Sequence, residues 1–288
     1  MRIDDVVRIQ GEPSIRFRIF LKEGVFVETV LFENRRGLRL CISTQAGCNM
    51  GCYFCATGLE WNRHNLTVDE IAGQVSLVLD YAGLHHTQIA SVTMAGMGEP
   101  LANYHNTMGA LELLSDLLGP DTLSFSTVGI TPMIKRMIRE AHARYRLYLS
   151  LHSPWQAVRE SIMPIARHFP IDDLLDVVSE YASSHRTGEV RISYLMLEEV
   201  NDREGDIEEL VRLLSGRNLP VQILLWNEVD GLRFRRVPEG RALSWVDRLN
   251  KAGIEAYAMP SEGRRIRAAC GQLMAKRPPV THLLTAPN

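Results

Sequence analysis

Cysteine is scarce in this sequence, and the few cysteines are unevenly placed. The chain has five in 288 residues. An odd number with three members inside one short loop does not suit a disulfide framework. It favours a protein that works in the reducing cytoplasm.

Long apolar runs and a secretory leader are also missing. No stretch approaches the roughly 18 apolar residues that a membrane-spanning helix needs. The start, Met1-Arg2-Ile3-Asp4-Asp5, is charged and lacks the apolar segment of a signal peptide. There is no internal repeat and no low-complexity tract. With 45% apolar and 23% charged residues, the composition predicts a soluble α/β protein of one large or two small domains, and no membrane partner.

The sequence has little net charge, −2, but distributes it unevenly. Residues 231–288 contain 11 Arg and Lys against 4 Asp and Glu, which is +7; residues 1–230 contain 21 against 30, which is −9. A basic C-terminal fifth on an acidic body indicates either a polyanionic partner or a solvated basic surface.

Cys48, Cys52 and Cys55 form a C-x3-C-x2-C loop. Thiolates at this spacing converge on an iron–sulfur cluster or on zinc. A structural zinc or a closed cluster needs four protein ligands, and the next cysteine downstream is Cys270. One metal position is therefore open, unless a distant His or Cys completes a zinc site. The spacing, with Phe54 before the third cysteine, resembles the radical S-adenosylmethionine (SAM) superfamily, in which SAM chelates the open iron of a 4Fe–4S cluster.

Hydrophobic patterning predicts a hairpin followed by alternating strands and helices. Apolar and other residues alternate over 14–21 and 25–32, on either side of the turn Lys22-Glu23-Gly24, which predicts the hairpin. The first dozen residues are expected to be an irregular arm. Thr67 and Glu70 form a capping-box signature. The strands that follow the hairpin are expected at 38–43, 88–94, 122–127, 147–152, 190–197, 221–226 and 255–259. Helices are expected at 67–81, 104–118, 132–144, 156–163, 172–185, 204–214 and 242–252.

This alternation predicts a parallel sheet with helices outside. About six strand–helix units follow the cysteine loop, too few for an eight-unit barrel, so the expected fold is a radical SAM partial (β/α)6 barrel with an N-terminal β-hairpin extension. We expect an arm and hairpin over 1–37, the barrel over 38–275 and a tail over 276–288.

Polar and glycine-rich motifs fall where the expected parallel strands end. In parallel sheets that edge holds the ligand. Each motif alone is weak, because glycine turns and helix-capping Ser-Thr pairs are common. Together with the cysteine loop they supply polar groups for the amino, carboxylate and ribose groups of SAM. The motifs are Gly96–Pro100, Ser126-Thr127, Ser150-Leu151-His152 and Trp226-Asn227.

The chain resembles the RlmN/Cfr family of radical SAM methyltransferases, which act on adenine in RNA. The likeness runs from about residue 14 to residue 275 and includes all five cysteines. The most specific stretches are Leu40–Cys48, the cysteine loop and Ala268-Ala269-Cys270-Gly271-Gln272-Leu273. The others are Val27–Val30, Asn65-Leu66-Thr67, the strand-end motifs above, Gly129, Met196-Leu197 and Val200-Asn201-Asp202.

The resemblance implies a cysteine-based methylation of an aromatic carbon. A first SAM methylates the Cys270 thiolate. A second SAM, on the cluster held by Cys48, Cys52 and Cys55, yields a 5′-deoxyadenosyl radical, and the methylene group on Cys270 then joins the substrate, normally at carbon 2 of adenine. Glu28 acts as general base, and Cys41 attacks the Cys270 sulfur to release the product.

By the same resemblance, the residues that hold SAM are Gly98, Glu99, Ser126, Ser150, His152 and Asn227, with Phe54 in the cluster loop. Without the family pattern, Cys41 is typical of small core filler and Glu28 of a solvated strand face. An electron donor such as flavodoxin or ferredoxin is also implied.

Two departures concern the substrate. Only 27 residues precede Glu28, whereas the family usually carries a small helical N-terminal domain that helps to hold RNA, so the resemblance is to a short form. In the stretch before Cys270, Arg265 stands in place of an acid and Ala258 in place of a basic residue. Glu228-Val229-Asp230-Gly231 replaces a proline-rich turn.

Three functions follow. The first is methylation of rRNA or tRNA, with Arg233, Arg235, Arg236, Arg264, Arg265 and Arg267 as phosphate contacts. The second is the same chemistry on a small molecule, nucleoside or peptide. The third is a non-catalytic iron–sulfur or SAM-binding regulator, which leaves Cys41, Glu28 and Cys270 without a purpose.

Overall fold

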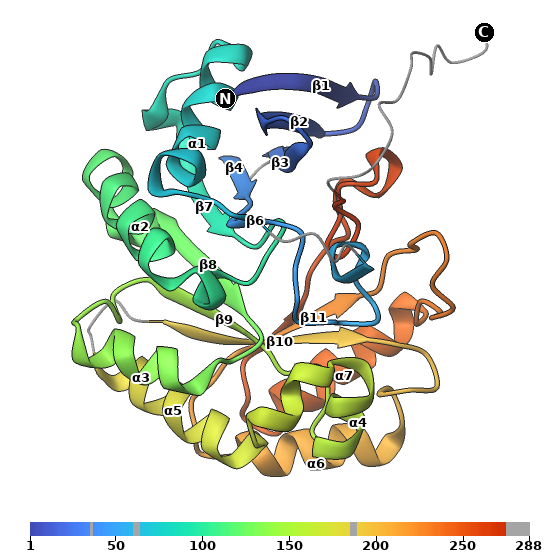
Figure 1. Cartoon of the computed structure of the whole chain (residues 1–288). Helices are drawn as coiled ribbons and strands as arrows, with labels where there is room; N and C mark the ends of the chain where they lie inside the picture. Colours follow the sequence, from blue (N-terminus) through green and yellow to red (C-terminus); the bar gives the residue numbers. More distant parts are fainter. Residues whose placement is uncertain (35–36, 60–63, 185–188, 275–288) are drawn as a thin grey trace, which may run out of the picture.

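The fold is built on one sheet of ten strands in a computed structural model, which describes residues 1–34, 37–59, 64–184 and 189–274. The strand order is β1-β2-β3-β4-β7-β8-β9-β10-β11-β12. From β4 to β12 all neighbours are parallel, and the helices lie along the outer side of the curved sheet (Figure 1). Because β1 and β12 are the two edges, the sheet is an open, partial barrel. The fold class predicted from the sequence is confirmed.

The strands of the large sheet are β1 (Arg2–Arg8), β2 (Ser14–Lys22), β3 (Val25–Asn34), β4 (Gly37–Ile42), β7 (Ile89–Met94), β8 (Leu123–Thr127), β9 (Arg146–Ser150), β10 (Val190–Met196), β11 (Val221–Leu225) and β12 (Ala256–Ala258). Two short strands, β5 (Gln45–Ala46) and β6 (His64–Asn65), pair separately. The α-helices are α1 (Val68–Ala82), α2 (Tyr104–Leu118), α3 (Thr131–Arg139), α4 (Gln156–Ile162), α5 (Ile171–Ser184), α6 (Glu204–Leu214) and α7 (Glu239–Lys251). The short 3-10 helices are η1 (Ala56–Leu59), η2 (His86–Gln88), η3 (Pro100–Asn103), η4 (Pro120–Thr122), η5 (Pro164–His168) and η6 (Arg264–Ile266).

The N-terminal arm is not irregular, and this prediction was wrong. Residues Arg2–Arg8 form β1, which pairs antiparallel with β2 of the predicted hairpin. A register shift between Ile3 and Asp5 breaks the alternation of apolar and polar residues, so the sequence pattern does not indicate a strand. Val6 and Val7 pack partly buried against the core and hold β1 in place.

Local signals set the ends of α1, and α3 is shorter than predicted. The capping box is present: the Glu70 N–H donates to Thr67 Oγ1 at 3.2 Å, and Glu70 Oε2 accepts from the Thr67 N–H at 2.9 Å. Helix α3 was expected to reach residue 144 but ends at Arg139. The chain turns there because Ala141 adopts a φ of +58° and the His142 N–H donates back to the Met137 carbonyl.

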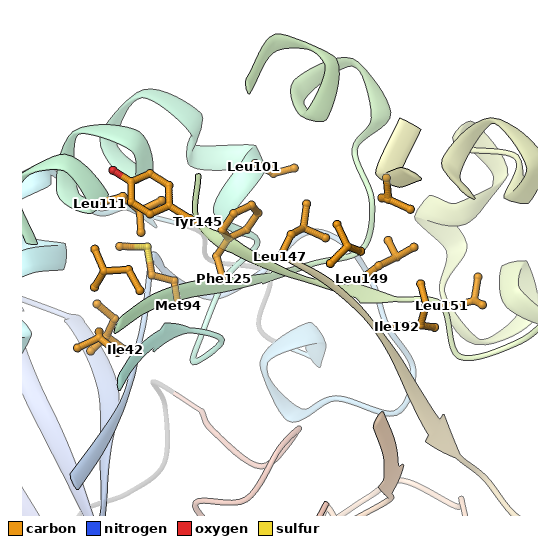
Figure 2. Close-up of a cluster of buried hydrophobic side chains, with 14 of the residues drawn as sticks. Ile42, Met94, Leu101, Leu111, Phe125, Tyr145, Leu147, Leu149, Leu151 and Ile192 are labelled. Atoms are coloured by element: carbon orange, nitrogen blue, oxygen red, sulfur yellow. The ribbon is translucent and has the colours of Figure 1, made fainter. Parts of the chain in front are cut away.

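Apolar side chains in register across the parallel strands build the core. Ile42, Met94, Phe125 and Leu147 are each paired with the next on adjacent strands β4, β7, β8 and β9. All four are at most 1% exposed, and Figure 2 shows this row between the sheet and the helices. Burial of each such side chain stabilises the fold by about 1.5–3 kcal/mol. The row fixes where the strands end, and so where the polar motifs meet.

A second, smaller group of apolar side chains surrounds the cysteine loop. We call it the loop bed, and it brings together the loop, the end of α4 and the ends of the last strands. Its buried members are Met50, Phe54, Ala56, Val128, Ile162, Met163, Ala166, Leu195, Leu197, Trp226 and Val229. The three cysteines of the loop are half-buried against it. Charges placed on the loop are therefore poorly hydrated.

Candidate active site

The cysteine loop follows β4 and is held by the protein on two sides. The Cys55 N–H donates to the Cys52 carbonyl at 3.2 Å, which closes a tight turn. The Tyr53 N–H donates to the Ile162 carbonyl at the end of α4, at 3.0 Å. Burial, and then the charges of Cys55 and Cys48, raise the pKa of Cys52 well above its ordinary value. The three thiols are thus close enough for each charge to affect its neighbours.

These thiols fit a cluster better than a single metal ion. Among the described residues, no three His, Cys, Asp or Glu side chains are placed to hold one metal ion together. A four-iron cluster binds each thiolate through a different iron, so the sulfurs need not meet at one point. Burial opposes three thiolates in this bed, and a cationic iron–sulfur core would offset that cost.

The turn Gly96–Pro100 follows β7 and packs directly against the start of the cysteine loop. A Cβ atom on Gly98, whose φ is +98°, would lie 2.7 Å from the backbone nitrogen of Gln45, so only glycine fits. The side chain of Gln45 in turn accepts the Glu99 N–H at 2.9 Å. The turn therefore places Glu99 at the carboxyl end of the sheet.

The Glu99 carboxylate is buried, at 3% exposure, with three hydrogen-bond donors around it. It accepts from the Thr127 hydroxyl at 2.6 Å, the Val128 N–H at 2.9 Å and the Leu101 N–H at 3.0 Å. Burial raises its pKa to about 7 although all three donors act in the opposite direction. The group therefore gains or loses its charge near neutral pH.

His152 follows β9 in a left-handed conformation, with a φ of +59°, and is 5% exposed. Its Nδ1 atom accepts the Leu195 N–H at 3.0 Å, and its ring is nearly perpendicular to the Phe54 ring, with centroids 5.2 Å apart. Burial, and then the charge of Arg159, lower its pKa to about 3. The imidazole is therefore neutral at physiological pH.

The other predicted strand-end residues lie at the same edge. Ser126 in β8 and Ser150 in β9 are half-buried. Asn227 follows β11 and is 2% exposed. Its Nδ2 atom donates to the Cys270 carbonyl at 3.3 Å, and its Oδ1 atom accepts from Arg236 at 3.2 Å. The structure thus places the predicted strand-end residues at one edge of the sheet, where His152 contacts Phe54 of the cysteine loop and Asn227 contacts the Cys270 segment.

The segment that carries Cys270 is attached to the cysteine loop. The Ala56 N–H donates to the Gly271 carbonyl at 2.8 Å, and the Thr57 hydroxyl donates to the Leu273 carbonyl at 2.7 Å. In Figure 1 the blue helix η1 lies beside this red segment. Cys270 is exposed to solvent, yet surrounding protein and then the Cys55 charge raise its pKa. The predicted tail, 276–288, lies outside the described residues.

Cys41 and Glu28 face the same segment from β4 and β3. Burial, and then the Cys270 thiol, raise the pKa of Cys41 to about 12. Glu28 is 1% exposed rather than on a solvated strand face. Its carboxylate lies 3.4 Å from the Arg16 Nε atom and accepts the Met274 N–H at 2.9 Å. Cys270, Cys41 and Glu28 are therefore gathered in one place from distant parts of the chain.

Several polar residues of the site carry no role in the sequence analysis. Asn201 is fully buried, accepts the Leu197 N–H at 2.7 Å and donates to the His152 carbonyl at 2.6 Å. The buried Gln74 of α1 joins β3 to the end of β4, through the Thr29 hydroxyl and the Ser43 backbone. Most of their partners are remote in sequence, as His152 is from Asn201 and Thr29 and Ser43 are from Gln74, so only the motif Val200-Asn201-Asp202 indicated one of them.

The arginines predicted to contact phosphates fall into two groups. Arg236 is partly buried and donates to the Trp226 carbonyl and to Ser261, while Arg235 and Arg267 pair with acids. By contrast, Arg233, Arg264 and Arg265 are exposed and have no ion-pair partner among the described residues. Two of these exposed arginines lie on η6, just ahead of Cys270.

Comparison with known proteins agrees with the observed fold. Residues 42–214 match the family model of the radical SAM superfamily. A crystal structure of a radical SAM methyltransferase from Sphaerobacter thermophilus superposes with a TM-score of 0.89 at 34% identity, covering 95% of this chain and 81% of that one. SuiB from Streptococcus suis, solved with S-adenosylmethionine, shares the fold, with a TM-score of 0.57 at 13% identity over 76% of this chain and 51% of its own. The chain is thus a radical SAM protein.

Full-length relatives define its place within the superfamily. The probable dual-specificity RNA methyltransferase RlmN of Dictyoglomus turgidum is 35% identical over 95% of this chain and 80% of its own length. The RlmN of Solidesulfovibrio magneticus is 37% identical over 94% and 78%. The chain belongs to the RlmN family of radical SAM methyltransferases. None of its described helices combines the length and apolar character that crossing a bilayer requires.

Proposed function

We propose that this methyltransferase methylates carbon 2 of adenine in RNA, with the methyl group carried on Cys270. The observation that carries the proposal is the meeting of Cys270, Cys41 and Glu28 beside the cysteine loop. The RNA acceptor is supported by the relatives, whose names specify RNA methyltransferases. The exposed arginines on η6 support it further. They have no ion-pair partner in the described part of the chain, and cations close to Cys270 suit the phosphodiester backbone of RNA.

The residues fit a 4Fe–4S cluster and SAM. Cys48, Cys52 and Cys55 would hold the cluster, beside Phe54. Gly98, Glu99, Ser126, Ser150, His152 and Asn227 would hold SAM. When bound, these groups supply the methyl group and, with one electron from a donor such as flavodoxin or ferredoxin, the radical chemistry, with two SAM used per turnover.

The remaining steps belong to side chains of this chain. Cys270 must lose its proton to accept a methyl group, and the product is an uncharged thioether. The methylated Cys270 sulfur carries no negative charge that would raise the pKa of Cys41. After the substrate has been joined, the Cys41 thiol attacks the Cys270 sulfur. This step forms the Cys41–Cys270 disulfide and breaks the bond from that sulfur to the carbon that leaves with the product. Glu28 takes the proton from the substrate carbon. Its contacts with the Arg16 guanidinium and the Met274 N–H hold the carboxylate in position for this step.

A methylation assay with defined acceptors tests this function. Cluster-loaded protein, reductant and methyl-labelled SAM are incubated with unmodified rRNA and tRNA transcripts, and the digested nucleosides are analysed by mass spectrometry. We expect label in 2-methyladenosine, and none with Cys270→Ala. Binding of the transcript should also weaken steeply with salt, because arginine contacts release counterions.

Two results would count against an RNA acceptor. The first is unlabelled RNA from protein whose Cys270 does become methylated. The second is transfer of the label to a free nucleoside, small molecule or peptide instead. Either result favours the alternative, the same radical chemistry in a biosynthetic pathway.

The affinity for SAM is expected to rise with pH and to level off near pH 7. The pKa of the Glu99 carboxyl is raised to about 7 in the free protein. The positively charged amino group of SAM binds the ionised carboxylate and not the protonated carboxyl group. Below that pH, binding must first release the proton, so the dissociation constant should increase by up to about tenfold per pH unit. Equilibrium dialysis of SAM against cluster-loaded protein, from about pH 6 to about pH 8, measures this.

The matched control is Glu99→Gln, which keeps the shape and removes the titration. It should bind SAM more weakly, with a flat pH profile. An equal slope in both proteins would mean that another group titrates.

A further inference from the structure

Among the described residues, the most completely buried arginine lies beneath the cysteine loop. Arg159, on α4, is 0% exposed and heads the group of large, fully buried side chains. Its guanidinium donates to backbone carbonyls where the strands end, at 2.6 Å to Val128 and 3.2 Å to Leu151. Longer bonds reach the carbonyls of Ser150 and Phe169, at 3.5 and 3.3 Å.

The positive charge of Arg159 is not neutralised by a carboxylate at contact distance. Among the described residues, each hydrogen-bond partner of the guanidinium is a carbonyl oxygen. The nearby Glu160 is bonded instead to Gln156, at 2.8 Å. A buried cation without a paired anion is costly to the fold. A further, negatively charged partner would account for its presence.

The packing directs this charge toward the cysteine loop. Helix α4 is joined to the loop by the bond from the Tyr53 N–H to the Ile162 carbonyl. Val128, whose carbonyl accepts from Arg159 at 2.6 Å, and Ile162, three residues further along α4, belong to the loop bed together with Met50 and Phe54 of the cysteine loop. The Arg159 charge and any charge on the cysteine loop are therefore separated by apolar side chains. The loop bed excludes water between them, so solvent screens this interaction weakly.

We propose that Arg159 is the buried counter-charge of the iron–sulfur cluster and raises its reduction potential. The inference rests on the cluster assigned above to Cys48, Cys52 and Cys55. A 4Fe–4S core with three thiolates carries one net negative charge when oxidised and two when reduced. Reduction adds one electron, supplied by a reduced viologen mediator, and no proton. A fixed positive charge therefore stabilises the reduced state more than the oxidised state. Arg159 is a positioning residue in this scheme, since it acts through the cluster rather than on the substrate.

Potentiometric titration followed by electron paramagnetic resonance tests the proposal on cluster-loaded, full-length protein. Arg159→Gln removes the positive charge. Arg159→Lys keeps the charge but replaces the planar guanidinium group, and so loses most of its hydrogen bonds to the carbonyls. We expect Arg159→Gln to lower the equilibrium constant for one-electron reduction by about tenfold, a shift of about 59 mV to lower potential. Arg159→Lys should stay near wild type, although its melting temperature falls. Arg167→Gln, an exposed arginine on the neighbouring η5, should leave the potential unchanged because water screens it.

A second replacement separates charge from folding. Citrulline at position 159 is neutral but has nearly the shape of arginine, so it can keep three of the four carbonyl contacts. It should shift the potential as Arg159→Gln does, even if the glutamine variant does not fold. Equal reduction potentials in the wild-type and citrulline proteins would overturn the proposal. They would show that Arg159 serves only to hold the strand ends together through its hydrogen bonds. Absence of iron and sulfide from the wild-type protein would instead refute the cluster itself, so the two failures are distinguishable.

Discussion

Cys41→Ala is expected to accumulate as a covalent adduct between Cys270 and the substrate, with turnover reduced on the order of 10³-fold or more. Cys41 acts only at release, after the substrate has been joined to the carbon on Cys270. Without it the Cys270 sulfur has no attacking thiol, because the cysteines of the loop are engaged elsewhere. Purification from the native host, digestion and mass analysis of the Cys270 peptide measure the adduct and identify the acceptor.

Two variants control this experiment. Cys270→Ala should take no label from methyl-labelled SAM and give no product. The double variant should form no adduct, which shows that the adduct depends on Cys270. An unmodified Cys270 peptide from Cys41→Ala, together with active wild-type protein, would show that Cys41 only packs in the core and does not release the product. A nucleotide mass on the peptide would support RNA, and a metabolite mass the alternative acceptor.

Replacing the cysteines one at a time is expected to divide them into two classes by iron content. Alanine at Cys48, Cys52 or Cys55 should abolish cluster binding, since three thiolates leave no spare ligand. Alanine at Cys41 or Cys270 should leave iron and sulfide at wild-type levels. Metal analysis of anaerobically reconstituted protein, with electron paramagnetic resonance before and after SAM, measures both classes.

The five alanine variants serve as controls for one another, because each removes one sulfur of similar size. Loss of iron from Cys270→Ala would show that its thiol is a ligand rather than a methyl carrier. Zinc as the metal bound by wild-type protein, or a spectrum unchanged by SAM, would refute the open-iron assignment.

Much of the fold follows from short-range patterns. The alternation of strands and helices, the capping box at Thr67 and the hairpin over β2 and β3 depend on neighbouring residues, and all three are present. Strand β1 was missed because its bulge disrupts the period of two. Helix α3 was predicted to be too long because the hydrophobic pattern does not reveal the left-handed conformation of Ala141.

The sequence by itself determined the candidate ligand set: three cysteines at cluster spacing, a glycine turn before Glu99 and polar residues at the strand ends. These features are local, since residue type and spacing decide what a short loop can bind. Only the tertiary structure decided which remote groups meet them. Glu28 and Met274 are 246 residues apart, and Arg159 reaches carbonyls on three separate segments.

The tertiary structure also decided the charge states of the site. Burial and neighbouring charges move the pKa to about 12 for Cys41, about 7 for Glu99 and about 3 for His152. None of these values follows from the residue type alone. A pKa depends on how much water packing removes and on which charges it brings near. Both are set by segments that lie far apart in the chain and become neighbours only in the folded protein.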